Sequence, residues 1–346
     1  MKYLNVLLLF VSVCISISCQ EEESLPVITD TNGSSGGTAV IITGAAARIT
    51  QELALLEALD NQGRLNNVTF ISGVSSGAIN TVMLNAVLDE TNDFDWQDYK
   101  DIVLNLQQSD VLVNRTNNLP VNTQPLWTTF DVTFTDRLGY MSLNDLPISS
   151  AVTATTLDLL GLEISSNVPE LSTFNGGITE VLMASASFPV AFPAIKINDN
   201  IYADGGLQEN IPVRVALQYQ QLRDVTFDTV YVVSYQKNTT MDWDRELGFL
   251  GVDKARKDFL QIGLERAGFD TDALSQKAFD DNLKKLRETN PDFAEKIMVY
   301  VPEIENLPYY GVFDFSEPTA KDSYEKASEW AQSNFPLSLD DYLDKL

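Results

Sequence analysis

Short apolar runs alternate with longer stretches of helical periodicity along this chain. The β-branched run at 38–42 predicts a buried strand, and the apolar positions spaced along 45–59 predict a helix directly after it. A strand-like run at 68–72 and a mostly apolar helical stretch at 77–88 repeat this pattern. Because strands and helices follow one another through short links, we expect a mostly parallel sheet with right-handed crossovers and helices on both faces.

The rest of the chain continues the alternation and indicates the fold class. Further strands are expected at 151–156, 227–234 and 296–301, the last two of which are rich in β-branched and aromatic residues. Further helices are expected at 178–187, 213–221, 253–265, 271–288 and 324–334. The predicted fold is therefore α/β, a three-layer α/β/α sandwich around a mostly parallel central sheet. The apolar content of 44% suits a large core, and 38–346 is expected to form a single domain.

The first 37 residues follow a different pattern. A charged start precedes an apolar run at 7–17 and small residues, which predicts a secretory signal peptide over 1–18, too short to span a membrane. Cys19 and the acidic run behind it resemble the lipidation site of bacterial lipoproteins. We therefore expect an exported lipoprotein, anchored through acylated Cys19 at the outer membrane or cell surface. The alternative is an ordinary signal peptide cut elsewhere, with Cys19 unmodified. Residues 19–37, which are polar and glycine-rich, are expected to form a flexible tether.

The charge balance narrows the range of partners. The chain carries 23 basic against 49 acidic residues, a net charge of −26. Binding to nucleic acid is not expected, because it requires a basic surface that neutralises phosphates. The same excess of negative charge opposes adsorption to an anionic bilayer, so an N-terminal lipid anchor would have to supply proximity to lipid.

A candidate nucleophile lies between the second predicted strand and its helix. Residues 73–77 read Gly-Val-Ser-Ser-Gly, the G-x-S-x-G spacing of a nucleophile elbow, with Ser75 at its centre. Gly73 and Gly77 leave room for the sharp turn that such an elbow needs. A serine hydroxyl requires a base, and none of the 346 residues is a histidine. Any serine chemistry here therefore uses a carboxylate or a lysine.

Asp204 is the candidate base. It ends an apolar stretch and precedes Gly205 and Gly206, a pattern that holds a carboxylate in a tight turn. Taken alone, Asp-Gly-Gly more often indicates a plain surface turn, and only its combination with Ser75 and the Gly44 turn favours a base.

Together these motifs resemble the patatin-like phospholipase family. The resemblance rests on a turn after the first strand at Gly44, the Ser75 elbow and the Asp204 motif, which is followed by Glu-Asn-Ile-Pro at 209–212. It covers about 38–215 well, including the whole of 183–212. It implies a phospholipase A-type hydrolase that cleaves carboxylic esters of lipids through an acyl-enzyme, without cofactor or metal. By motif, Ser75 would be the nucleophile and Asp204 the base of a Ser-Asp dyad.

The first turn departs from the family pattern. Where the family carries three glycines, one further residue, Arg and Gly, this chain carries Gly44, Ala45, Ala46, Ala47, Arg48 and Ile49, so only Gly44 and Arg48 match. Residues 44–48, hereafter the oxyanion turn, are expected to stabilise developing negative charge through backbone N–H groups. Alanine keeps its N–H but does not readily adopt positive φ, so the turn is expected to shift or to carry strain. The alternative function is a catalytically weak or inactive surface lipoprotein of this fold with a binding role.

Residues 89–150 interrupt the alternation of strands and helices. They are rich in Asn and Asp, contain Pro120 and Pro125, and carry the aromatic residues Trp96, Trp127 and Phe130. We expect a lid-like insertion over one end of the sheet. Its aromatic side chains either line an acyl channel or only anchor a long loop.

Other chemistries receive little support from the sequence. Ser323 and Lys326 match an S-x-x-K spacing, but the companion motifs of Ser-Lys enzymes are missing. The acidic clusters at 93–95, 242–244 and 270–272 lack the remainder of an EF-hand loop. No metal or other cofactor is therefore expected.

Overall fold

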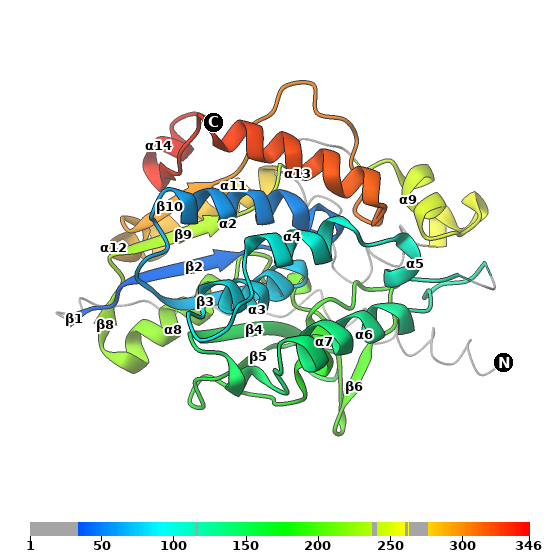
Figure 1. The fold of residues 1–346 in the computed structure, drawn as a ribbon, viewed down its shortest axis with the longest axis horizontal. Helices are drawn as coiled ribbons and strands as arrows, with labels where there is room; N and C mark the ends of the chain where they lie inside the picture. The colour runs from blue at the N-terminus through cyan, green and yellow to red at the C-terminus, as the bar shows by residue number, and fades with distance from the viewer. Residues whose placement is uncertain (1–33, 115–116, 237–240, 260–261, 263–275) are drawn as a thin grey trace.

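The computed structural model describes residues 34–114, 117–236, 241–259, 262 and 276–346 (Figure 1). The predicted signal peptide, Cys19 and most of the predicted tether lie outside the described residues. Among the residues that are described, no helix is long and apolar enough to cross a membrane.

A mixed, mostly parallel sheet forms the centre of the molecule. Its order within the described residues is β11-β10-β9-β2-β3-β4-β7-β6, and β5 also pairs with β4. The parallel strands are β2 (Thr38–Ile42), β3 (Val68–Val74), β4 (Ser149–Thr156), β9 (Thr229–Val233) and β10 (Ile297–Tyr300). The antiparallel strands are β5 (Leu162–Ser166), β6 (Ile195–Ile197), β7 (Asn200–Asp204) and β11 (Leu337–Ser338). β1 (Ser34–Ser35) pairs separately with β8 (Val225–Thr226).

Helices cover both faces of this sheet (Figure 1). The alternation of side chains along the strands explains the two layers. In β2, Ala39 and Ile41 pack on one face with α8 (Val213–Arg223), α11 (Gln276–Thr289) and α14 (Leu339–Leu343). Val40 and Ile42 pack on the other face with α2 (Ile49–Asn61), α3 (Ser76–Leu88) and α13 (Glu317–Ala331). The predicted three-layer α/β/α architecture is confirmed.

The predicted element boundaries need several corrections. The helix expected from residue 45 begins at Ile49, because the preceding residues form the oxyanion turn and the 3-10 helix η2 (Ala46–Arg48). The short strands β5, β6, β7 and β11 were not predicted, since each has only two to five residues and lacks a long apolar run. The helix expected at 253–265 is described only in part, beginning with η6 (Lys254–Arg256), and residues 271–275 of the next predicted helix lie outside the described residues.

Most of the remaining helices lie near the end of the sheet that carries Ser75, whereas α12 lies at the opposite end (Figure 1). The segment predicted as an insertion contains α4 (Trp96–Leu104), α5 (Gln108–Val111), α6 (Gln124–Phe130), the π-helix η3 (Asp131–Arg137) and η4 (Leu143–Asp145). The others are α7 (Ile178–Ser185), η5 (Gly205–Leu207), α9 (Trp243–Phe249) and α12 (Pro291–Ala294). Apolar residues of α3, α4, α6, η3 and α7 share one core, so the segment is packed onto the body.

Candidate active site

Ser75 occupies a sharp turn between β3 and α3. Its φ of 55° and ψ of −124° lie in a region that residues with a Cβ rarely adopt, and its side chain is only slightly exposed. A Cβ on Gly73 would lie 2.1 Å from the Gly77 carbonyl oxygen, and one on Gly77 would lie 2.4 Å from the Ile42 carbonyl oxygen. Both predicted glycines are therefore required for β3 and α3 to meet at this angle.

Strand pairing brings Asp204 to Ser75. β3 pairs with β4 as far as Val74 opposite Thr153, and β7 pairs with β4 from Asp204 opposite Ala154. β5 pairs with the opposite edge of β4, so β3 and β7 lie end to end along the same edge of β4. The Ser75 hydroxyl lies close enough to the Asp204 carboxylate to interact with it and to lower its pKa. The two predicted residues are thus in contact, although 129 positions separate them in the sequence (204 − 75).

The environment of Asp204 differs from that of a surface turn. The side chain is 3% exposed, and its Oδ1 accepts a hydrogen bond of 2.8 Å from the Gly206 N–H. Burial raises the pKa of Asp204 to about 6, while the Ser75 hydroxyl and the hydrogen bond from Gly206 oppose that shift. A Cβ on Gly205 would lie 2.5 Å from the Thr153 carbonyl oxygen, so this glycine allows the close approach to β4.

The end of α7 positions both members of the pair. Ser185 Oγ accepts a hydrogen bond of 2.8 Å from the Ser75 N–H and donates one of 2.7 Å to the Thr153 carbonyl. The Ser187 carbonyl accepts a hydrogen bond of 3.0 Å from the Asp204 N–H. The sequence reasoning assigned these serines no role. The run of small residues at 184–187 was the available signal.

The five residues of the oxyanion turn make different contacts. The Ala45 N–H donates to Ser76 Oγ at 2.7 Å, and the Ala47 N–H donates to the Val312 carbonyl at 3.0 Å. Ala46 adopts a φ of 50°, whereas Ala45 has a φ of −126°. The expected strain is therefore present at Ala46 alone. Within the described residues, no acceptor is bonded to the Ala46 and Ser76 N–H groups, and both residues line the pocket beside Ser75.

Gly44 and Arg48 fix the two ends of this turn. A Cβ on Gly44 would lie 2.6 Å from Asn210 Oδ1 and 3.1 Å from the Ser75 Cβ, so a larger residue would displace Asn210 and crowd Ser75. Arg48 is buried, donates from Nε to the Tyr310 carbonyl at 2.9 Å, and lies over the Tyr235 ring. Its side chain therefore supports the turn from behind and is not among the residues that line the pocket beside Ser75.

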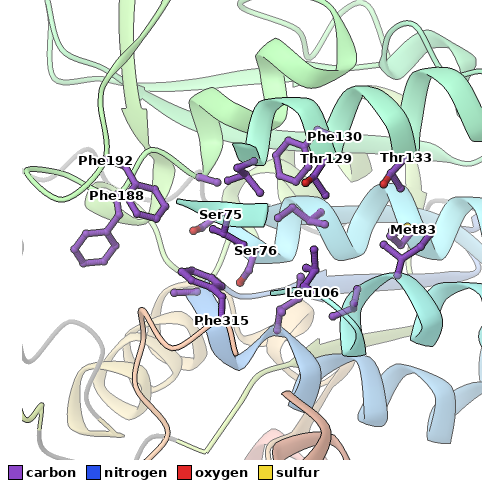
Figure 2. A pocket seen from close by; sticks show the side chains of 18 of the residues that line it. Ser75, Ser76, Met83, Leu106, Thr129, Phe130, Thr133, Phe188, Phe192 and Phe315 are labelled. Atoms are coloured by element: carbon purple, nitrogen blue, oxygen red, sulfur yellow. The ribbon is translucent and has the colours of Figure 1, made fainter. Parts of the chain in front are cut away.

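An apolar pocket opens beside Ser75 (Figure 2). Its volume is about 770 Å³, counting the open mouth. In Figure 2, Ser75 lies between Phe188 and Phe192 on one side and Met83 on the other, with Phe130 across the pocket. The main lining groups come from α3, α4, α6, η3 and the loops around Phe188 and Phe313.

Some aromatic residues of the 89–150 segment line the pocket, and others anchor the segment to the body. Phe130 lines the pocket. Trp96 anchors its helix to the body, donating from Nε1 to Asp60 Oδ2 at 2.7 Å and stacking on Tyr99. Trp127 packs against the core without lining the pocket.

The alternative chemistries find no support in the described residues. Ser323 is buried in α13, and Lys326 pairs with Asp322 at 3.6 Å. No group of His, Cys, Asp and Glu in this part of the chain is arranged to hold a metal ion.

Comparisons with known proteins place this geometry in a family. No curated protein matches the sequence. VipD from Legionella pneumophila is similar in structure, with 14% identity, a TM-score of 0.37 and coverage of 93% of this chain and 73% of that one. The type III effector ExoU of Pseudomonas aeruginosa has 11% identity and a TM-score of 0.36, over 87% of this chain and 53% of that one. Human GIVD cytosolic phospholipase A2 has 13% identity and a TM-score of 0.28, over 57% of this chain and 26% of that one. The family model for patatin-like phospholipase matches residues 35–217, just over half of the 346 residues. The chain therefore belongs to the patatin-like phospholipase family.

Proposed function

We propose that this protein is a serine acyl hydrolase that cleaves carboxylic esters of lipids through a Ser75-Asp204 dyad. The observation that carries the proposal is the interaction between the Ser75 hydroxyl and the buried Asp204 carboxylate, beside an apolar pocket. An apolar pocket with few polar groups suits an acyl chain. A carboxylate can act as the base for Ser75, which is required because the chain contains no histidine.

Acylation would proceed by proton transfer within the dyad. Asp204 takes the proton from the Ser75 hydroxyl as its oxygen attacks the ester carbonyl, and the carbonyl oxygen acquires the negative charge. Collapse of the tetrahedral intermediate breaks the bond to the alcohol, which receives the proton from Asp204. The acyl group is then an ester of Ser75.

Deacylation would reverse these roles with water. Asp204 takes a proton from a water molecule, the resulting hydroxide attacks the acyl carbonyl, and the proton returns to Ser75 as the carboxylic acid leaves. The Ala46 and Ser76 N–H groups are the candidate donors to the oxyanion in both steps, because both lie beside Ser75 and no acceptor within the described residues is bonded to them.

Labelling with a fluorophosphonate tests the dyad. The parent protein is expected to be labelled, and Ser75→Ala and Asp204→Ala to lose the label, since the reagent needs an activated serine. Ser323→Ala, which removes the hydroxyl of the S-x-x-K motif, serves as the matched control and should label like the parent. Equal labelling of the parent and Ser75→Ala would refute the proposal.

The oxyanion turn also favours a second candidate, a catalytically weak protein of this fold with a binding role. One N–H of the turn is taken up by Ser76 Oγ, and Ala46 is held at a φ of 50°. Ala46→Gly relieves that conformation and should raise the turnover of a short ester if the chemistry is limited by the turn. Ala45→Gly is the control, because Ala45 has an ordinary φ. A folded parent and Ala46→Gly that both lack turnover would favour binding.

For localisation, we propose that Cys19 is acylated and anchors the protein to the membrane from which its substrate is taken. The support is the sequence alone, namely the apolar run, Cys19 and the acidic residues behind it. Cys19→Ser should move the protein from the detergent phase to the aqueous phase in a Triton X-114 partition. Unchanged partition would contradict the anchor.

A further inference from the structure

The oxyanion turn is held from outside by a segment close to the C-terminus. The Val312 carbonyl accepts the Ala47 N–H at 3.0 Å, and the Tyr310 carbonyl accepts Arg48 Nε at 2.9 Å. Residues 309–313, hereafter the supporting segment, lie between β10 and α13 and belong to no helix or strand. Their position therefore depends on contacts with other parts of the chain.

A carboxylate on α9 makes several of those contacts. Glu246 Oε1 accepts the Val312 N–H at 3.0 Å, and Oε2 accepts the Phe313 N–H at 3.1 Å. The Tyr309 hydroxyl also donates to Oε1. The Glu246 side chain is fully buried. Two consecutive backbone donors and one hydroxyl thus converge on this carboxylate from the supporting segment.

Packing reinforces this arrangement. A Cβ on Gly311 would lie 2.5 Å from the Phe249 ring and 3.2 Å from Glu246 Oε1, so the close approach of α9 requires glycine at this position. The Phe313 ring lines the pocket and packs edge-on against Phe188 at 5.2 Å between ring centroids. The supporting segment therefore contacts both the oxyanion turn and the pocket wall.

Charge also favours a carboxylate here. Arg48, on the oxyanion turn, interacts electrostatically with Glu246, on the far side of the supporting segment. Burial raises the pKa of Glu246, and the hydrogen bonds from Tyr309, Phe313 and Val312 together with the Arg48 charge oppose that shift. An amide NH₂ in place of one Glu246 oxygen would face a backbone N–H of the supporting segment, so two donors would meet without an acceptor.

We propose that Glu246 is a positioning residue for ester hydrolysis, acting through the supporting segment on the backbone donors of the oxyanion turn. This inference rests on the proposed function, and Glu246 lies beyond the 35–217 stretch that the family model matches. Donors to an oxyanion act on charge that develops in the transition state, so their displacement lowers kcat more than it changes KM.

The test compares Glu246→Gln with Asp280→Asn in the full-length protein. Asp280 is also a buried carboxylate on a helix and accepts a tyrosine hydroxyl, from Tyr342 at 2.9 Å, but it lies on the other face of the sheet. A short acyl ester is the substrate, because it relies little on the pocket wall. Glu246→Gln should lower kcat by roughly tenfold or more, a smaller decrease than the complete loss of one oxyanion donor would cause. The KM should change by less than about threefold. Asp280→Asn should leave kcat near that of the parent.

Amide hydrogen exchange gives a readout that does not depend on turnover. Glu246→Gln should speed exchange in 44–50 and 309–315, and Asp280→Asn should not. Unchanged kcat and unchanged exchange in Glu246→Gln would overturn the inference. If that variant fails to fold, Tyr309→Phe, which removes one donor to Glu246 and the acceptor of the Asp242 N–H, should show smaller changes in the same direction. Its failure to do so would equally overturn the inference. If the parent is neither labelled nor active on esters, the proposed hydrolysis is refuted. Faster exchange in Glu246→Gln would in that case still support the structural link between Glu246 and the oxyanion turn.

Discussion

Replacing Asp204 with asparagine should stabilise the protein while abolishing turnover. The carboxylate is fully buried, and its pKa is raised from the usual 3.8 to about 6, so its ionised form is less favourable in the folded protein than in the unfolded chain. Each pKa unit corresponds to about 1.4 kcal/mol, so ionised Asp204 lowers the free energy of unfolding by about 3 kcal/mol. A buried charge that costs stability is expected where a catalytic base is required.

The pH dependence of this effect has a definite sign. Because the folded-state pKa is the higher one, the folded protein holds the Asp204 proton between about pH 4 and pH 6 while the unfolded chain has lost it. The stabilising contribution of the neutral carboxyl is therefore fully present below about pH 4 and is lost as the pH rises through about 6. Asparagine is neutral throughout, so the stability difference between Asp204→Asn and the parent should grow by about 3 kcal/mol over that interval.

Urea unfolding followed by tryptophan fluorescence, at pH values from 4 to 8, measures this difference. All other acidic residues are common to both proteins and cancel when the two free energies of unfolding are subtracted. Ser75→Ala keeps the carboxylate but removes an interaction that lowers its pKa, so its stability should depend on pH at least as strongly as that of the parent. A difference that stays constant with pH, or an asparagine variant that is less stable than the parent at pH 8, would refute the reasoning.

Three other outcomes are expected at the same site. The kcat/KM for a neutral ester should fall about tenfold per pH unit below about pH 6, because Asp204 must be ionised to act as base, and a midpoint near pH 4 would contradict its burial. Ser185→Ala should destabilise the fold by about 1–3 kcal/mol in urea unfolding and lower kcat, because the Ser75 N–H loses its acceptor. Ser187→Ala is the control and should affect kcat less, because the Ser187 hydroxyl donates to the Met183 carbonyl. Equal effects of the two substitutions on kcat would count against positioning by Ser185. Phe130→Leu should shift the chain-length profile of ester hydrolysis toward longer acyl groups by enlarging the pocket, and an unchanged profile would show that the chain binds elsewhere.

Several features of the fold follow from local sequence. Strand β2, helix α2, strand β3 and helix α3 are consecutive, and the period of their apolar residues matches the faces that they bury, so the parallel sheet and its two helical layers are predictable. Gly73 and Gly77 signal the Ser75 elbow because the turn is made by adjacent residues. The start of α2 was less predictable, since residues 45–48 are good helix formers that instead form the oxyanion turn.

The sequence alone also determined that any base for Ser75 is a carboxylate or a lysine, because the chain contains no histidine. It did not decide between a surface turn and a buried base at Asp204, since that depends on the pairing of β7 with β4 and on the burial that raises the pKa. The contact of Ser185 with Ser75 and that of Glu246 with the supporting segment likewise depend on tertiary packing. Such contacts join residues tens to hundreds of positions apart, and local propensity carries no information about which of them meet.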